Sequence, residues 1–283
     1  MLVPSVESIL LSDGYRAAVR WWRPGRPRGA VLYFHGIQSH GGWYEQSGRL
    51  LAEGDLAVLM PDRRGSGMNQ HQRGHVASVE QCLSDAQELL ETLVTESGFS
   101  SVHVVGVSWG GKLSVALAGT APARVRTLSL VAPGLFPRID LATTDKFRVA
   151  MAMMNDRHHL FDIPLNDPHL FTSNPARLAF LEGDTLMLRQ VSASFLLASR
   201  HLDRHVRRFP RSGWRGGVHL LLAGRDKVID NDRTRQWFES LPSPDRQLSE
   251  YPPAEHTIEF EEDASRFYQD LTSWIAARCG EAP

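Results

Sequence analysis

Gly106-Val107-Ser108-Trp109-Gly110 is the stretch that decides the fold of this 283-residue chain. It follows the apolar residues 102–105, which predict a buried strand, and precedes residues 111–118, which predict a helix. A residue at such a strand-to-helix turn takes strained backbone angles, and side chains two positions away would collide with the crossing backbone. The two flanking glycines therefore predict a nucleophile elbow with Ser108 as the nucleophile.

Apolar segments rich in strand-forming residues alternate with amphipathic ones along the rest of the chain. This alternation predicts an α/β fold, a mostly parallel sheet covered by helices on both faces. A short Ser12-Asp13-Gly14 turn predicts that the first two strands pair as an antiparallel hairpin at the sheet edge. Strands are expected at residues 6–11, 15–22, 30–34, 56–60, 102–105, 125–131 and 218–223, and helices at 46–53, 81–96, 111–118 and 264–278.

Residues 135–211 interrupt the alternation and predict a helical cap (lid) inserted into a core of residues 1–134 and 212–283. No strand is expected in this segment, and helical spacing of apolar residues is clearest at 146–154 and 186–198. Methionine is flexible and polarisable, so three cap methionines are candidates for binding substrate, although plain helix packing explains them equally well. They are Met151, Met153 and Met154.

A serine nucleophile needs a base, and the base needs an acid that fixes its tautomer. In the order serine, acid, histidine, the downstream candidates are Asp226 and His256. Asp226 follows the strand expected at 218–223, at the carboxyl edge where active sites of open α/β sheets lie. Each alone could be an ordinary loop residue, but their joint occurrence in this order, each in a loop beside the expected element, favours the catalytic interpretation. Asp230, which suits a helix N-cap, is the reserve candidate for the acid.

An oxyanion hole requires two backbone N–H groups aimed at the charge that develops on the substrate. One is expected from Trp109, directly after the nucleophile. The other is expected from Ile37, in the loop that follows the strand at 30–34. A glycine-rich turn without chemistry is the alternative interpretation of this loop.

Three motifs carry a resemblance to a known family: HGIQSHGGWY at residues 35–44, DRRGSG at 62–67 with RGH at 73–75, and GVSWGG at 106–111. With these motifs the chain resembles the α/β-hydrolase superfamily, and within it the monoacylglycerol lipase and lysophospholipase branch. The resemblance covers nearly the whole chain. It implies the α/β-hydrolase fold, with a mostly parallel eight-stranded sheet and a cap inserted after the sixth strand.

Charge and composition narrow the choice of partners. The formal net charge is −1, which predicts no attraction to nucleic acid, and no apolar run is long enough to predict stable membrane insertion. The start of the chain lacks a leader pattern, so a cytoplasmic location is expected. Two scattered cysteines, Cys82 and Cys279, predict neither disulfides nor a zinc site, and no metal or cofactor is expected. The oligomeric state is left open.

The expected activity is cleavage of small-molecule carboxylic esters through an acyl-enzyme formed on Ser108. The resemblance implies monoacylglycerols, lysophospholipids or medium-chain esters as substrates. Two alternatives stay open: amide or peptide hydrolysis, as in proline iminopeptidases, and a ligand-binding protein that has kept the fold and lost turnover.

Overall fold

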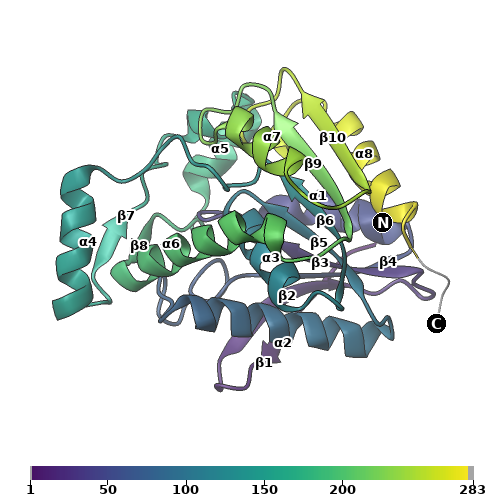
Figure 1. Ribbon diagram of the computed structural model, residues 1–283, viewed down its shortest axis with the longest axis horizontal. Coiled ribbons are helices and arrows are strands. Elements are labelled where there is room, and N and C mark those ends of the chain that lie inside the picture. Colours follow the sequence, from purple (N-terminus) through teal and green to yellow (C-terminus); the bar gives the residue numbers. More distant parts are fainter. Residues whose placement is uncertain (1, 280–283) are drawn as a thin grey trace.

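A computed structural model describes residues 2–279, so the outermost residues of the expected core, 1 and 280–283, lie outside the described residues. Its centre is an eight-stranded sheet in the order β1-β2-β4-β3-β5-β6-β9-β10 (Figure 1). β1 and β2 form the expected hairpin, β2 is antiparallel to β4, and the remaining pairs are parallel, which confirms the predicted fold class. The bounds are β1 (Ser5–Leu10), β2 (Arg16–Trp22), β3 (Gly29–Phe34), β4 (Leu56–Pro61), β5 (Val102–Val107), β6 (Val125–Val131), β9 (Gly217–Ala223) and β10 (Arg246–Tyr251).

β10 is the strand that the sequence analysis does not locate. The inner strands β3, β4, β5 and β9 are buried along their whole length and show as apolar runs. β10 lies at the sheet edge, reads Arg-Gln-Leu-Ser-Glu-Tyr, and buries only Ser249 and Tyr251. An edge strand with so little burial lacks the apolar signal of a core strand.

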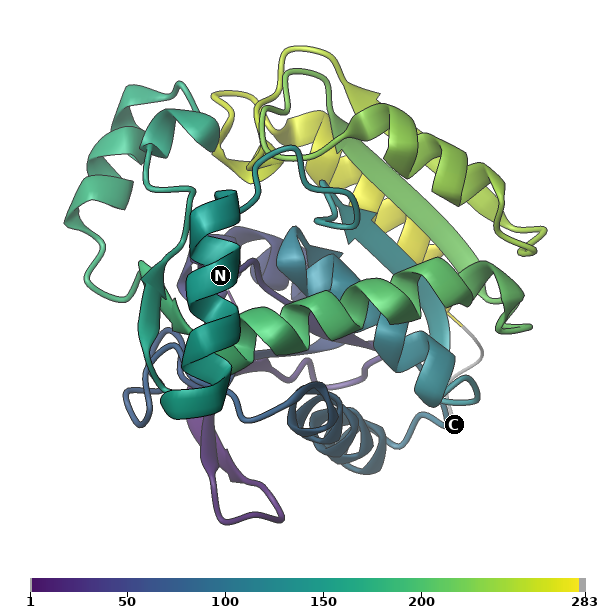
Figure 2. The same cartoon turned by 60° about the vertical axis from the view of Figure 1, so that its left-hand side comes forward.

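Helices cover both faces of the sheet. α2 and α3 pack against each other on one face, and α1 packs against α8 on the other (Figure 2). Within residues 2–279, no helix combines the length and the apolar character that spanning a bilayer requires. The core helices are α1 (Glu45–Glu53), α2 (Val79–Ser97), α3 (Trp109–Thr120), α7 (Asn231–Glu239) and α8 (Ser265–Ala276), with short 3₁₀ turns at Gly41–Tyr44 and Ile258–Phe260.

The inserted segment, residues 135–211, leaves the sheet after β6 and returns at β9. It contains α4 (Thr143–Asn155), β7 (Leu160–Asp162), α5 (Pro175–Gly183), β8 (Gln190–Ser192) and α6 (Ala193–Arg208), with 3₁₀ turns at Pro168–Leu170 and Phe209–Arg211. α6 packs against α3 and α2 (Figure 1). The inserted segment is therefore attached directly to the helix that follows Ser108.

Two expectations for the inserted segment are wrong. β7 and β8 form a small antiparallel pair where no strand was expected; with three residues each they are too short for a periodic signal. The helix expected at 186–198 begins only at Ala193, because the Ser192 side chain accepts a hydrogen bond from the Phe195 N–H and caps the helix there. Before this helix, the chain makes a turn at residues 185–186 and then forms β8 (Gln190–Ser192).

Candidate active site

Ser108 occupies the turn between β5 and α3 with φ 50° and ψ −120°, a strained conformation for a residue with a side chain. Strain of this kind costs on the order of 1–3 kcal/mol and persists only where neighbours fix the backbone. The Ser108 backbone N–H donates to the Val131 backbone oxygen at 3.0 Å. The Ser108 backbone oxygen accepts from the N–H groups of Gly111 at 2.9 Å and Gly134 at 2.7 Å. These backbone bonds hold the serine at the carboxyl edge of the sheet.

The glycines that flank Ser108 are required by close packing. A Cβ on Gly106 would lie 2.4 Å from the Ser114 hydroxyl oxygen, and one on Gly110 would lie 2.4 Å from the Phe34 backbone oxygen. Both distances are shorter than any real Cβ contact. The elbow predicted from sequence is thus present, for the steric reason expected.

Ser108, His256 and Asp226 lie in one hydrogen-bonded row. His256 Nε2 lies 2.9 Å from Ser108 Oγ, and His256 Nδ1 lies 2.8 Å from Asp226 Oδ2. The other Asp226 oxygen accepts from the N–H groups of Val228 at 2.8 Å and Ile229 at 3.0 Å. All three side chains are buried, so the imidazole is held between a hydroxyl and a fixed carboxylate.

The reserve candidate for the acid, Asp230, caps a helix. Its Oδ1 accepts a hydrogen bond from the Arg233 N–H at 3.0 Å, which makes it the N-cap of α7. The loop after β9 turns early, because Gly224 packs against Pro252 so closely that a Cβ would lie 2.6 Å away. This turn brings Asp226 to the histidine and leaves Asp230 at the helix.

The loop that follows β3 lies against Ser108. A Cβ on Gly36 would be 3.3 Å from Ser108 Cβ, and Ile37 lines the same cavity as Ser108 and Trp109. The two residues expected to supply the oxyanion hole therefore flank Ser108 from two different segments.

Arg63 joins these two segments, a contact that the sequence analysis does not anticipate. Its Nη2 donates to the backbone oxygens of Ile37 at 2.6 Å and Gly36 at 3.1 Å, and its guanidinium lies 4.7 Å from the Trp109 ring centroid. Burial lowers the pKa of Arg63 to about 10, so it stays charged at neutral pH. The signal that could have identified it is its place just after β4, whose carboxyl end adjoins that of β3.

A cavity of about 390 Å³ opens at Ser108 under the inserted segment. Most of the side chains that line it are apolar, among them Ile139, Leu141, Val149, Met153, Ile163, Leu165, Leu196 and Ile229. Such a cavity can hold a flexible apolar chain with its reactive end at the serine.

Only one of the three methionines expected to bind substrate lines this cavity. α4 presents Lys146, Val149, Ala150 and Met153 to the cavity, a spacing of three or four residues that marks one helix face. Met151 and Met154 lie on other faces of α4 and are 44% and 82% exposed. The expectation for Met151 and Met154 is therefore wrong, because three neighbouring helical positions cannot share one face.

The eight-stranded sheet, the elbow and the serine–histidine–aspartate row define the class: this is an α/β-hydrolase. A family model described as serine aminopeptidase, S33, matches residues 25–263, and the chain belongs to this family.

Two curated relatives are similar along at least 90% of their length. The monoglyceride lipase of Rattus norvegicus is 24% identical over 277 residues, which cover 96% of this chain and 90% of the relative. The monoacylglycerol lipase of Mycolicibacterium smegmatis is 23% identical over 269 residues, which cover 93% of this chain and 94% of the relative. The resemblance to the monoacylglycerol lipase branch is thereby confirmed.

Solved structures share the fold. The crystal structure of the Paleococcus ferrophilus monoacylglycerol lipase gives a TM-score of 0.82 at 23% identity and covers 93% of this chain and 100% of that one. A soluble variant of the Saccharomyces cerevisiae monoglyceride lipase, in complex with a substrate analog, gives a TM-score of 0.88 at 18% identity. The match covers 99% of this chain and 97% of that one.

Proposed function

We propose that this carboxylic ester hydrolase works through an acyl-enzyme on Ser108. Ser108 Oγ attacks the ester carbonyl while His256 Nε2 takes the hydroxyl proton, and Asp226 stabilises the resulting imidazolium. His256 then delivers this proton to the leaving alcohol. A water molecule, deprotonated by His256, attacks the acyl-enzyme, releases the acid and returns Ser108 to its starting form.

The negative charge of each tetrahedral intermediate would be bound by the backbone N–H groups of Ile37 and Trp109. Donors that are already in place stabilise such charge without reorganising at the moment of reaction. Arg63 contacts both segments, through the Ile37 oxygen and the Trp109 ring. We assign it the role of a positioning residue for these donors.

The substrates we propose are esters with a single acyl chain, such as monoacylglycerols, lysophospholipids or medium-chain esters. The observation that carries this proposal is the largely apolar cavity that reaches Ser108. Each methylene buried there contributes about 0.8 kcal/mol, or roughly fourfold in affinity. Residues 135–211 supply most of the apolar wall and would act as a cap over the site. The names of the two relatives support monoacylglycerols among these substrates.

Peptide-bond hydrolysis is the second candidate, because the family is described as serine aminopeptidase. An aminopeptidase needs a carboxylate that is free to bind the substrate ammonium group. The cavity contains Asp140 and Asp203, but Lys146 and Lys112 already pair with them at 2.8 and 2.6 Å. This pairing favours esters.

A panel of p-nitrophenyl esters from two to ten acyl carbons, with amino-acid p-nitroanilides beside it, tests the proposal. We expect kcat/KM to rise with chain length until the cavity is full, and the anilides to react far more slowly. A flat or falling profile, or anilides that match the esters, would overturn it. We also propose a cytoplasmic location, which fractionation of the source cells tests.

A further inference from the structure

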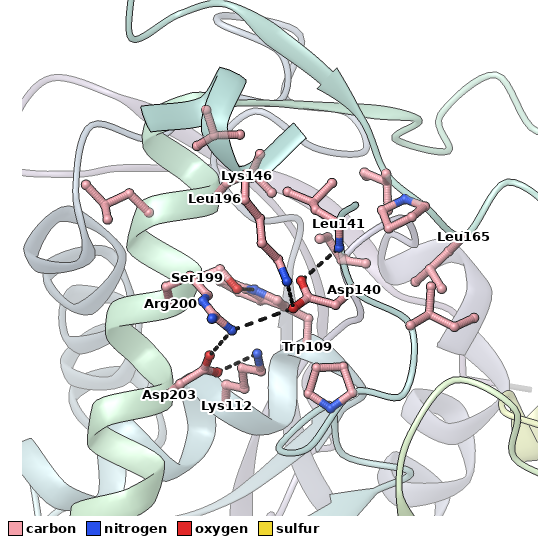
Figure 3. A pocket seen from close by; sticks show the side chains of 18 of the residues that line it. Trp109, Lys112, Asp140, Leu141, Lys146, Leu165, Leu196, Ser199, Arg200 and Asp203 are labelled. Carbon is pink, nitrogen blue, oxygen red and sulfur yellow. Dashed lines mark hydrogen bonds and ion pairs between the residues drawn. The ribbon is translucent and has the colours of Figure 1, made fainter. Parts of the chain in front are cut away.

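Five charged side chains meet inside the cavity that reaches Ser108, and we call them the charged cluster: Lys112, Asp140, Lys146, Arg200 and Asp203. Lys112 Nζ lies 2.6 Å from Asp203 Oδ1, and Lys146 Nζ lies 2.8 Å from Asp140 Oδ2. Arg200 Nη1 lies between the two pairs, 3.7 Å from Asp203 and 4.0 Å from Asp140 (Figure 3). Three separate parts of the chain, α3, α6 and the start of the inserted segment, converge here.

The charged cluster lies close to the nucleophile. Lys112 follows Ser108 by four residues at the start of α3, which corresponds to a rise of about 6 Å along the helix. Trp109, directly after the nucleophile, donates its indole N–H to Ser199 of α6 at 3.0 Å, and Ser199 is the neighbour of Arg200. A substrate held at Ser108 therefore has this polar wall within reach.

The carboxylates of the cluster are already occupied. Asp140 accepts from the Leu141 N–H at 2.8 Å as well as from Lys146. Burial acts to raise the pKa of Asp140, but the hydrogen bonds from Lys146 and Leu141 and the charge of Arg200 outweigh it and lower that pKa. Asp203 and Lys112 form a buried pair that neutralises itself.

Arg200 differs from the other members. The two carboxylate oxygens nearest to its Nη1 lie at 3.7 and 4.0 Å, beyond hydrogen-bond distance. Three cations against two carboxylates leave the cluster with a formal charge of +1. The side chain is 64% exposed, so its donors remain available to a ligand in the cavity.

Resting on the proposed function, we propose that Arg200 binds an anionic group, a carboxylate or a phosphate, carried by the ester substrate. The guanidinium fork matches two oxygens of either group. The substrate would then combine an apolar chain with one anionic end, on its acyl side or on its alcohol side.

Matched pairs of esters separate the two sides. For the alcohol side, 1-octanoylglycerol is compared with 1-octanoylglycerol 3-phosphate; for the acyl side, p-nitrophenyl hexanoate is compared with mono-p-nitrophenyl adipate. We expect kcat/KM to favour the anionic member of one pair by about tenfold at low salt, because hydrogen bonds to charged groups are the stronger class. This preference should shrink as ionic strength rises.

Arg200→Gln should abolish the preference, because kcat/KM for the anionic ester falls by about tenfold while kcat/KM for the neutral ester falls far less. Arg148→Gln is the matched control: Arg148 lies in the same inserted segment, is also 64% exposed and also contacts an aspartate three residues away, but does not line the cavity. The control should keep the preference.

Binding measurements keep the test independent of turnover. Calorimetry should show octyl phosphate binding about tenfold more tightly than octanol to the wild-type protein, and equally to Arg200→Gln. Equal affinities for octyl phosphate and octanol in the wild type would overturn the proposal. So would an Arg200→Gln variant in which kcat/KM falls equally for neutral and anionic esters. The cluster would then serve only to hold α6 against α3. A protein that binds octyl phosphate as expected but hydrolyses no ester would instead contradict the proposed function.

Discussion

Arg63 donates a 2.6 Å hydrogen bond to the backbone oxygen of Ile37. The same guanidinium lies over the ring of Trp109, so one buried side chain contacts both residues assigned to the oxyanion hole. The Ile37 N–H shares its peptide plane with the Gly36 carbonyl, and Arg63 also donates to this Gly36 oxygen at 3.1 Å. Because the Ile37 N–H can turn away only if that bond breaks, its orientation depends on Arg63.

Replacing Arg63 with methionine should therefore lower kcat by about ten- to a hundredfold, less than the loss of an oxyanion donor itself. KM should change little, because ground-state binding in the apolar cavity is untouched. Arg64→Met is the control: Arg64 lies in the same loop but pairs with Asp85, at 2.7 Å, and with Asp13. It should lower the melting temperature and spare kcat. Equal losses of kcat in the two variants would show that Arg63 matters only for stability.

Asp226→Asn should depress kcat by on the order of 10⁴-fold, since an amide in that place favours the wrong imidazole tautomer of His256. Asp230→Asn should leave kcat within twofold, because asparagine is as good an N-cap as aspartate. Steady-state kinetics on one chromogenic ester compares them directly. A larger loss in Asp230→Asn would move the acid away from Asp226.

The cap side of the cavity can be tested with two adjacent residues. Met153→Glu places a charge in the apolar cavity and should flatten the rise of kcat/KM with acyl length, while acetate esters stay close to the wild-type rate. Met154→Glu, on the exposed side of α4, should leave the profile unchanged. The idea fails if the two variants give the same profile.

Stability should respond to acid through a buried histidine on β5. Burial lowers the pKa of His103 to about 3, against about 6.5 in an unfolded chain. Between these values only the unfolded chain binds this proton, so the free energy of unfolding falls with falling pH by about 1.4 kcal/mol per unit. Glu259, whose pKa burial raises to about 7, acts in the opposite direction.

The variant His103→Gln removes the one proton that the unfolded chain binds at this position and the folded chain does not. It retains an amide next to Thr127. Urea unfolding at pH 4, 5 and 6 should give a slope against pH that is shallower than the wild-type slope by about 1.4 kcal/mol per unit. Identical slopes would mean that His103 is protonated in the folded protein as well.

Local patterns were enough to predict most of the core. The elbow, the hairpin and the buried strands are visible in sequence because each depends on neighbouring residues: glycines at a close contact, a short turn, or continuous burial. β10 is not predicted, because this edge strand buries few side chains and has no apolar run. The start of α6 is not predicted correctly, because the capping side chain of Ser192 begins the helix at Ala193 although helical apolar spacing continues further upstream.

The contacts around Ser108 could be predicted only in part. The order serine, aspartate, histidine limits the partners of the nucleophile to a few loop residues. No such rule exists for Arg63 or for the charged cluster. Within this cluster, Lys112, Asp140 and Asp203 lie 28 to 91 positions apart in the sequence. Their pairing depends on how the inserted segment folds back onto α3, which sequence periodicity does not describe.

Covalent labelling decides whether Ser108 is the nucleophile. A fluorophosphonate probe, followed by digestion and mass spectrometry, should give one adduct on Ser108. Ser108→Ala should resist labelling and lose at least about 10⁴-fold in turnover while keeping its melting temperature within a few degrees. An adduct on another serine, or near-normal turnover in Ser108→Ala, would show that Ser108 is not the nucleophile.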